Sequence, residues 1–232
     1  LIAIENRIIH GIDYDSLGFV TLKSQTAYVS TTSFFQPVSN APSLHRAIRQ
    51  AGNNDGWTVV IEPGTYPDKA LVSTNLTLTS TGTNAPVTAP TLEMRGSGKT
   101  LNMDVDFYVS DSLKLTDGNI ALGVEDIQVL NGAILGGGSA SSFITSSGTG
   151  LLVYESLGAT AVSFPLGTAQ GYYPLSVSNS GSADAIGFRA VSDVLSNGLV
   201  GTPVDSVVNA TWVVNEGTVG GSNLSIVAGW PG

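Results

Sequence analysis

The chain has 232 residues, only 12% of them charged, and nine basic against eighteen acidic side chains give a net charge of −9. The charged fraction is about half of the usual ~25%, so Ser, Thr, Asn and Gly must supply most of the polar surface. The acidic balance and the scattered Lys and Arg disfavour nucleic acid or an anionic membrane as partner, whereas the lack of Cys excludes disulfides, thiolate metal sites and cysteine nucleophiles.

Two features of the chain bear on its cellular context. No uninterrupted apolar run reaches about 18 residues, so no membrane insertion is predicted. The chain begins LIAIENR, without Met or a signal-peptide pattern, and it ends SIVAGWPG in the style of a strand. Both ends suggest a piece of a longer or processed protein.

The first half predicts short strands and one helix. Residues 1–39 read as strands separated by turns. In NAPSLHRAIRQAG, apolar residues fall at helical spacing, with Ser43 as N-cap and Gly52 as the stop. The outward side of this helix, near 43–52, would hold His45, Arg46 and Arg49. It is expected to cap the structure that follows.

Residues 57–140 alternate between apolar and polar side chains, and each short run ends in Gly, Asp or Asn. Many short strands with regular turns favour a β-solenoid, in which each coil buries its inner face on its neighbours. The spacing of these turns predicts an uneven coil length, about 16 residues early and about 7–12 later, which indicates an irregular parallel β-helix. We expect it to be right-handed and to occupy residues 1–140.

From residue 141 the strands become longer. Six or seven alternating strands in about 90 residues favour an antiparallel β-sandwich over residues 141–232. The Gly-rich GGGSASS at 136–142 would be the junction. The predicted fold class is therefore all-β: a right-handed parallel β-helix with one capping helix, followed by an Ig-like antiparallel β-sandwich.

Two resemblances add to this interpretation. The order SLHRAIRQAG, WTVVIEPGTY and LTLTSTG, over residues 43–140, resembles the entry of pectin-lyase-like β-helices. In the second half, FITSSGTG, FPLGT, YYPLSVSNSG, NATWVVNE and GGSNLSI resemble a module of Bacteroidetes surface proteins exported by the type IX secretion system, including gliding-motility adhesins. This resemblance implies an extracellular, multi-domain parent on the bacterial cell surface.

An enzyme has to be considered, because pectin-lyase-like folds often hold polysaccharide lyases and glycoside hydrolases. Such sites need paired or clustered carboxylates with a base. The best candidates are Asp104 and Asp106, which share a strand face, with Asp111 and Lys114 nearby. Alternation with Met103, Val105 and Phe107 is also typical of a solvated coil, so no catalytic residue is assigned and the chain is predicted not to be an enzyme.

Metal and cofactor sites are not predicted either. The Asp/Asn clusters at 13–18 and 53–57 lack the register of a calcium loop and indicate Asx turns. His10 and His45 have no partners at metal-ligand spacing, and both are expected to be solvated. No cofactor is implied by any motif.

Aromatic residues supply the candidate ligand contacts. Tyr172 and Tyr173 are adjacent, so on a strand one faces inward and the other outward. An exposed tyrosine among hydroxyl and amide side chains can stack on a sugar ring. Trp212 and Trp230 are expected in the sandwich core.

These observations together predict a non-catalytic part of a secreted bacterial cell-surface adhesin or structural stalk, mediating adhesion or extracellular assembly. The alternative is a β-helix carbohydrate-active enzyme, a polysaccharide lyase or glycoside hydrolase, or its glycan-binding accessory module. Expected partners are other domains of the parent protein, surface glycans and secretion-system components.

Overall fold

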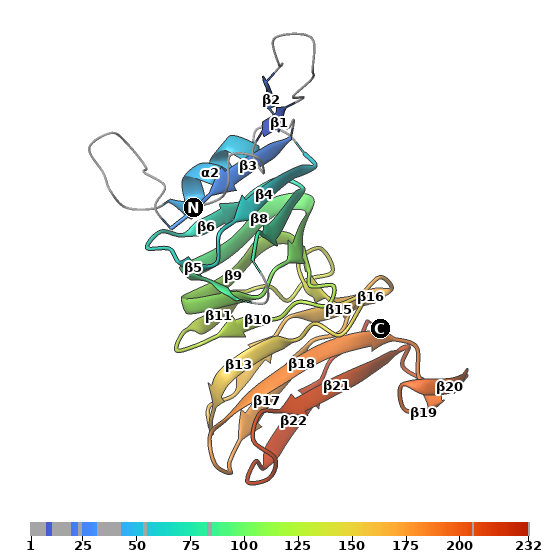
Figure 1. Cartoon of the computed structure of the whole chain (residues 1–232). Helices are drawn as coiled ribbons and strands as arrows, with labels where there is room; N and C mark the ends of the chain where they lie inside the picture. Colours follow the sequence, from blue (N-terminus) through green and yellow to red (C-terminus); the bar gives the residue numbers. More distant parts are fainter. Residues whose placement is uncertain are drawn as a thin grey trace.

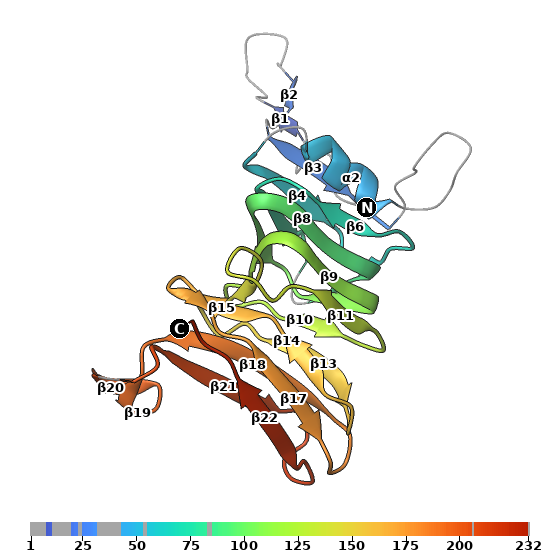
Figure 2. The same ribbon diagram turned by 180° about the vertical axis from the view of Figure 1, so that it is seen from behind.

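The computed structural model is a column of stacked β-coils with a helix at one end and two antiparallel layers at the other (Figures 1 and 2). It describes residues 8–10, 20–22, 25–31, 43–52, 55–82, 85–205 and 207–231. Within these ranges no helix is long and apolar enough to span a bilayer. A small antiparallel hairpin, β1 (Ile8–His10) with β2 (Val20–Leu22), precedes the column.

The body of the column is a parallel β-solenoid of about five coils. It confirms the predicted all-β solenoid, and its coils have three faces. The strands are β3 (Thr26–Val29), β4 (Trp57–Ile61), β5 (Gly64–Thr65), β6 (Ala70–Val72), β7 (Leu76–Ser80), β8 (Val87–Asp104), β9 (Phe107–Ala121), β10 (Ile127–Val129), β11 (Ala133–Gly136), β12 (Ile144–Thr145), β13 (Leu152–Leu157) and β15 (Leu166–Thr168).

Each face is one parallel ladder. The first face stacks β3, β4, β7, the end of β8, the end of β9, β12 and β15. The second stacks β5, the start of β8, the start of β9, β10 and β13. The third stacks β6, β11 and the middle segments of β8 and β9. The long strands β8 and β9 therefore turn two corners and serve all three faces.

Coil length follows from the register. Val87 pairs with Phe107 and Phe107 with Ile127, so these two coils are equal in length, and the next one, from Ile127 to Leu152, is longer. The turn spacing in the sequence is shorter than any of these steps, so the prediction that it gives the coil length is wrong. Turn residues mark the corners as well as the ends of coils, so the short units are single strands, three to a coil.

Inward-facing apolar residues form continuous columns inside the solenoid. Successive coils place them directly above one another, and each is at most 2% exposed. Full burial of one such side chain contributes roughly 1.5–3 kcal/mol, so stacking of coils is the main source of stability. The column of the first face consists of Leu76, Leu101, Ile120, Ile144 and Leu166, and that of the second of Val87, Phe107, Ile127 and Leu152.

The predicted helix is confirmed as α2 (Leu44–Ala51), with Leu44, Ala47, Ile48 and Ala51 buried against the first coils. Its N-cap is Ser43, whose Oγ accepts from Arg46 N at 3.1 Å. Asp68, from the next coil, accepts from Ser43 Oγ and from the N–H groups of Leu44 and His45 at 2.7–2.9 Å. A carboxylate at the helix N-terminus satisfies otherwise unpaired N–H groups and complements the helix dipole. Asp68 thereby fastens the cap to the solenoid.

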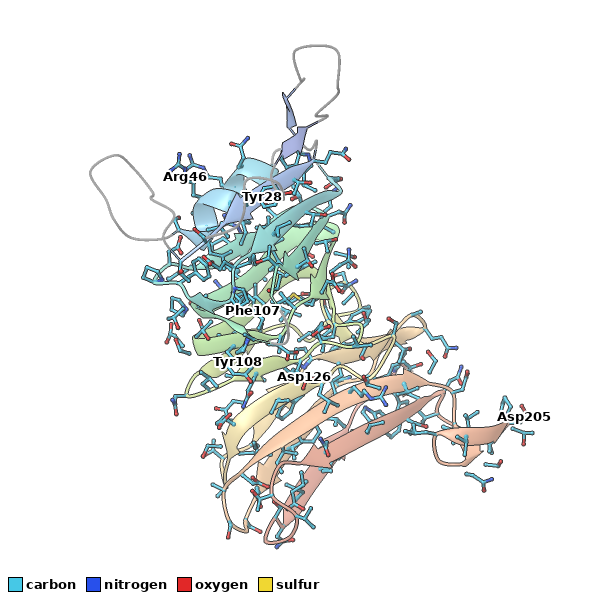
Figure 3. The ribbon with its side chains drawn as sticks, in the orientation of Figure 1. Tyr28, Arg46, Phe107, Tyr108, Asp126 and Asp205 are labelled. Carbon is cyan, nitrogen blue, oxygen red and sulfur yellow. The ribbon has the colours of Figure 1, made fainter. Side chains whose placement is uncertain are left out.

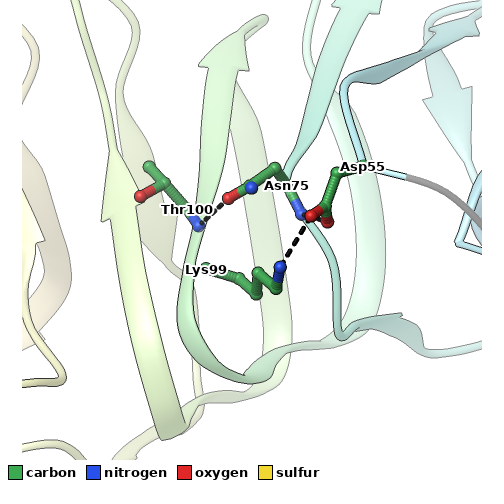
Figure 4. A network of polar contacts seen from close by, with 4 residues as sticks. All are labelled: Asp55, Asn75, Lys99 and Thr100. Atoms are coloured by element: carbon green, nitrogen blue, oxygen red, sulfur yellow. Dashed lines mark hydrogen bonds and ion pairs between the residues drawn. The ribbon is translucent and has the colours of Figure 1, made fainter.

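Side chains at the corners also join successive coils. Figure 4 shows Asn75 N donating to Asp55 Oδ1 at 3.0 Å, and Asn75 Oδ1 accepting from Thr100 N at 2.8 Å. Lys99 Nζ contacts Asp55 Oδ2 at 2.6 Å, and this hydrogen bond is the main reason that the pKa of Asp55 is lowered. Asp55 thus bonds to the next coil, whereas the sequence predicted a local Asx turn.

The far end of the column has two antiparallel layers. One continues the solenoid sheet from β13 to β18 (Asp184–Ser192) and β21 (Ala210–Glu216). The other contains β14 (Val162–Phe164), β17 (Leu175–Asn179) and β22 (Leu224–Ala228). Phe164 and Phe188 are buried where the layers meet, with ring centroids 4.3 Å apart. Two hairpins extend from this end: β16 (Gly171–Tyr172) pairs with β15, and β19 (Leu195–Asn197) pairs with β20 (Val200–Pro203).

The hydrogen-bonded sheet crosses the predicted domain boundary at residue 140. Ile144 stacks on Ile120 and Leu166 stacks on Ile144, so the first face of the solenoid continues to β15. The segment 136–142 lies within this continuous stack and closes a small turn through the Ser139–Ser142 bridge. The division into 1–140 and 141–232, and an Ig-like character for the second part, stay predictions.

Candidate ligand-binding site

Tyr172 and Tyr173 face opposite sides of the β15–β16 hairpin. Gly167 pairs with Tyr172, and Tyr173 N donates to Leu166 O at 2.8 Å, which fixes the backbone of both tyrosines. Tyr172 is half-buried, whereas Tyr173 is only 5% exposed. One tyrosine therefore reaches the surface and the other enters the core, the alternation that their adjacency predicts.

Tyr173 packs in the core and does not line the pocket described below. Its ring meets Trp212 edge-to-face, with centroids 6.3 Å apart, and Trp212 Nε1 donates to Tyr173 O at 3.0 Å. Tyr173 therefore holds the hairpin against β21 and has no free face for a ligand.

Tyr172 lines a surface pocket of about 410 Å³. Its ring is backed by Phe143 at a centroid distance of 6.0 Å, and burial raises the pKa of its hydroxyl. The lining residues come from the 140 region, from the hairpin and from the chain after β22, and none of them is charged. They are Ala140, Gln170, Gly171, Tyr172, Pro174, Gly229, Trp230 and Pro231.

Trp230 forms an exposed wall of this pocket. Its side chain is 57% exposed, so the expectation that it lies in the core is wrong. The reason is the position of Gly229: its N–H donates to Pro174 O at 2.9 Å and ends the pairing of β22, which turns Trp230 out beside Pro174 and Tyr172. Asn209 Nδ2 donates to Gln170 Oε1 at 2.6 Å and orients the one amide in the lining.

Such a pocket can hold a flat apolar face and offer a few neutral hydrogen bonds. Aromatic rings with proline walls favour stacking, and the Tyr172 hydroxyl and the Gln170 amide can donate or accept. Charged ligands would find no counter-charge here. The sequence indicated Tyr172 but not Trp230, because the contact joins two segments that are distant in the sequence and that only the fold brings together.

Asp104 and Asp106 line a different pocket, of about 180 Å³, with Thr79 and Glu125 among its other residues. Thr79 Oγ1 donates to Asp104 Oδ2 at 2.8 Å, and Asp106 Oδ1 accepts from Asp126 N at 2.8 Å. Val105 between them is buried, so both carboxylates face outward, as predicted. The structure does not bring the other two candidates here: Lys114 pairs with Glu93 at 3.3 Å on the third face, and Asp111 lies near the start of that face.

Glu125 and Asp126 complete an acidic group that the sequence patterns did not indicate (Asp126 is labelled in Figure 3). Burial, then the charge and hydrogen bond of Asp106, raise the pKa of Glu125. Burial also raises the pKa of Asp126, against the hydrogen bond from Leu151 N at 2.7 Å. The coil step from Phe107 to Ile127 also places Asp126 above Asp106, so a known coil length would have indicated that these two acids lie together. Within the described ranges, no group of three or more His, Asp or Glu side chains is arranged to hold a metal ion.

The raised pKa of Glu125 predicts a stability that depends on pH. A carboxyl whose pKa is higher in the folded state stabilises the fold below its unfolded pKa, and this contribution is lost as the pH rises through the folded pKa. Glu125→Gln should therefore increase the free energy of unfolding at pH 7 by a few tenths to about 1 kcal/mol, and leave it unchanged near pH 3. Urea unfolding at the two pH values measures the difference.

Glu93→Gln is the matched control of opposite sign. Although burial raises its pKa, the hydrogen bonds from Thr116 and Lys114 lower it below the usual value. This substitution should destabilise the protein at pH 7 and have little effect at pH 3. If Glu125→Gln instead lowered the free energy of unfolding equally at both pH values, the charge of Glu125 would not be what destabilises the fold at pH 7.

The remaining sequence candidates fall in various places. His45 is half-buried, and its Nδ1 is buried with no hydrogen-bond partner among the described residues, so it is not the solvated side chain expected. The backbone of His10 lies in β1. The prediction for the His10 side chain, the cluster at 13–18, and Asn53 with Asn54 lie outside what the structure describes.

Comparison of the chain with models of protein families, with curated proteins and with solved structures finds no match. The site must therefore be interpreted from its own geometry.

Proposed function

We propose that this chain is a non-catalytic part of a secreted bacterial cell-surface protein, an adhesin or stalk that contacts neutral glycans through the Tyr172–Trp230 pocket. The observation that carries the proposal is the uncharged aromatic pocket in a chain whose net charge is −9. Neutral sugar rings present apolar C–H faces that stack on aromatic rings, together with hydroxyls that suit Tyr and Gln.

The solenoid supports a structural role for the rest of the chain. Continuous ladders on three faces and buried apolar columns make a stiff spacer, which would hold the pocket away from a cell surface. An Ig-like end module, export by the type IX system and a larger parent protein belong to the same proposal, supported by the motifs in residues 143–226. Neighbouring domains and secretion components would be its partners.

The test is binding of neutral oligosaccharides to the chain and to pocket variants. Tyr172→Ala and Trp230→Ala should each raise Kd about tenfold, which corresponds to a loss of about 1.4 kcal/mol of stacking. Tyr172→Phe should keep most of the affinity, because the ring remains. Isothermal titration calorimetry gives Kd, and quenching of the exposed Trp230 by acrylamide should fall when sugar binds.

Tyr108→Ala is the matched control, because Tyr108 is a half-buried tyrosine on the second face of the solenoid, outside the pocket. It should leave Kd unchanged. A Kd that is unchanged in both Tyr172→Ala and Trp230→Ala would show that this pocket does not bind the sugar. New unsaturated or reducing ends in pectin or alginate, lost in Asp106→Asn, would instead favour the alternative function, a β-helix carbohydrate-active enzyme.

A further inference from the structure

Strand β22 has one unpaired edge. In the described part of the chain it pairs with β17 alone. Asn223 O accepts from Ser180 N and Gly229 N donates to Pro174 O, so within the register the odd-numbered residues of this strand bond to β17. The N–H and C=O groups of Leu224, Ile226 and Ala228 therefore point away from β17, toward the free edge.

The space between the two layers is open on the same side. Ile226 lies opposite the buried Val177 and faces inward, yet it is 44% exposed. On the other layer Val214 lies opposite the buried Phe188, also faces inward, and is 40% exposed. Inward apolar residues at an edge are normally covered, and these two mark the end of the core that no described element closes.

Charge selects the partner. The chain carries −9, but β22 (LSIVA) has no charged residue, and no Lys, Pro or inward charge protects its edge. Asp184 and Glu216 belong to the other layer, where Asp184 accepts from Thr218 N at 2.9 Å and Glu216 accepts from Gly220 N at 3.0 Å. A charged segment would find no counter-charge on β22 itself. Two copies of β22 can pair without bringing like charges of this strand together.

We propose that two copies pair through β22 in antiparallel register, with Ile226 opposite Ile226 of the second copy. Leu224 would then pair with Ala228, so the strand is complementary to itself around a two-fold axis. The β14–β17–β22 layers of the two copies would join into one six-stranded sheet, and the Ile226 side chains would be covered. This pairing does not depend on the glycan pocket.

The lack of cysteine allows a clean cross-linking test. Directly paired strand positions lie about 5.5 Å apart between Cα atoms, within disulfide range. Under mild oxidation Ile226→Cys should form a covalent dimer. Val219→Cys, on the loop before β22 and 94% exposed, is the matched control and should stay monomeric.

Sedimentation velocity on the unmodified chain supplies the second measurement. The chain should be a dimer at about 100 µM, and Ile226→Lys should make it a monomer, because two buried ammonium groups would meet at the two-fold axis. If Ile226→Lys does not fold, Val227→Lys is the substitute, because its position is 67% exposed and the variant should fold. It should also weaken the dimer. A monomeric chain at this concentration, or equal cross-linking of Ile226→Cys and Val219→Cys, would overturn the proposal.

Discussion

Gly118→Ala should destabilise the protein by about 3 kcal/mol or more, because two penalties combine at this position. Gly118 has φ +81°, where a residue with a Cβ is strained. A Cβ there would also lie 2.2 Å from Gly96 O and 2.8 Å from Lys99 O on the coil below. Both obstacles are backbone atoms, so only a separation of the coils could relieve the clash. Guanidinium unfolding followed by circular dichroism measures the loss.

Gly98→Ala isolates the first penalty. Gly98 has φ +65°, and a Cβ there would meet nothing within 4 Å. This variant should lose only about 1 kcal/mol, the strain of the left-handed backbone alone. Equal losses for Gly98→Ala and Gly118→Ala would mean that the coils do not approach as closely at this corner as the structure has them.

Phe164→Ala should lose about 3–5 kcal/mol, the range for truncation of a fully buried aromatic ring. Phe164 is 0% exposed, and its ring lies 4.3 Å from that of Phe188 and 6.3 Å from that of Tyr154. These contacts join the second antiparallel layer to the sheet that continues from the solenoid. Phe164→Leu, which keeps most of the volume, should lose less than about 1.5 kcal/mol.

The same variant tests whether the column unfolds as one unit. Because β13 pairs with both β10 and β18, damage at Phe164 should lower the unfolding midpoint of the whole chain. Fluorescence of Trp57, in the solenoid, and of Trp212, in the far layers, can be followed separately after replacement of the other tryptophans by Phe. Coincident transitions are expected. A Trp57 transition unmoved by Phe164→Ala would instead place a domain boundary near residue 140.

Local patterns predicted the elements well and their stacking poorly. Ser43 and Gly52 bracket α2 as expected, since a capping hydroxyl and a helix stop act within one turn of chain. The alternation of apolar and polar residues predicted that Asp104 and Asp106 both face outward. Register between coils could not be read from the chain, because it depends on which of several similar apolar runs come to lie above one another.

The residues of the candidate site, too, could be predicted only where their signal is local in the sequence. Tyr172 was predicted as a ligand contact from its neighbours, whereas Trp230, which lines the same pocket, was expected in the core. Apolar alternation through SNLSIVAGW gives no sign that β22 ends at Ala228 and that Trp230 turns outward. Asp68 gave no sequence signal at all, because its role is to bind the start of a helix that lies well before it in the chain. Glu125 joins Asp104 and Asp106 only through the coil step that the turn spacing obscured.

The direction of the ladders determines how the column would respond to force. Its strands lie across the long axis, and the chain completes one coil before it enters the next. A pull on the two ends would therefore peel the outermost coil first and leave the others intact. A coil such as the one from Val87 to Phe107 would release about 65 Å of extended chain in exchange for about 5 Å of column. Tension would thus be absorbed in large discrete steps of lengthening, while sideways bending would meet all three ladders together.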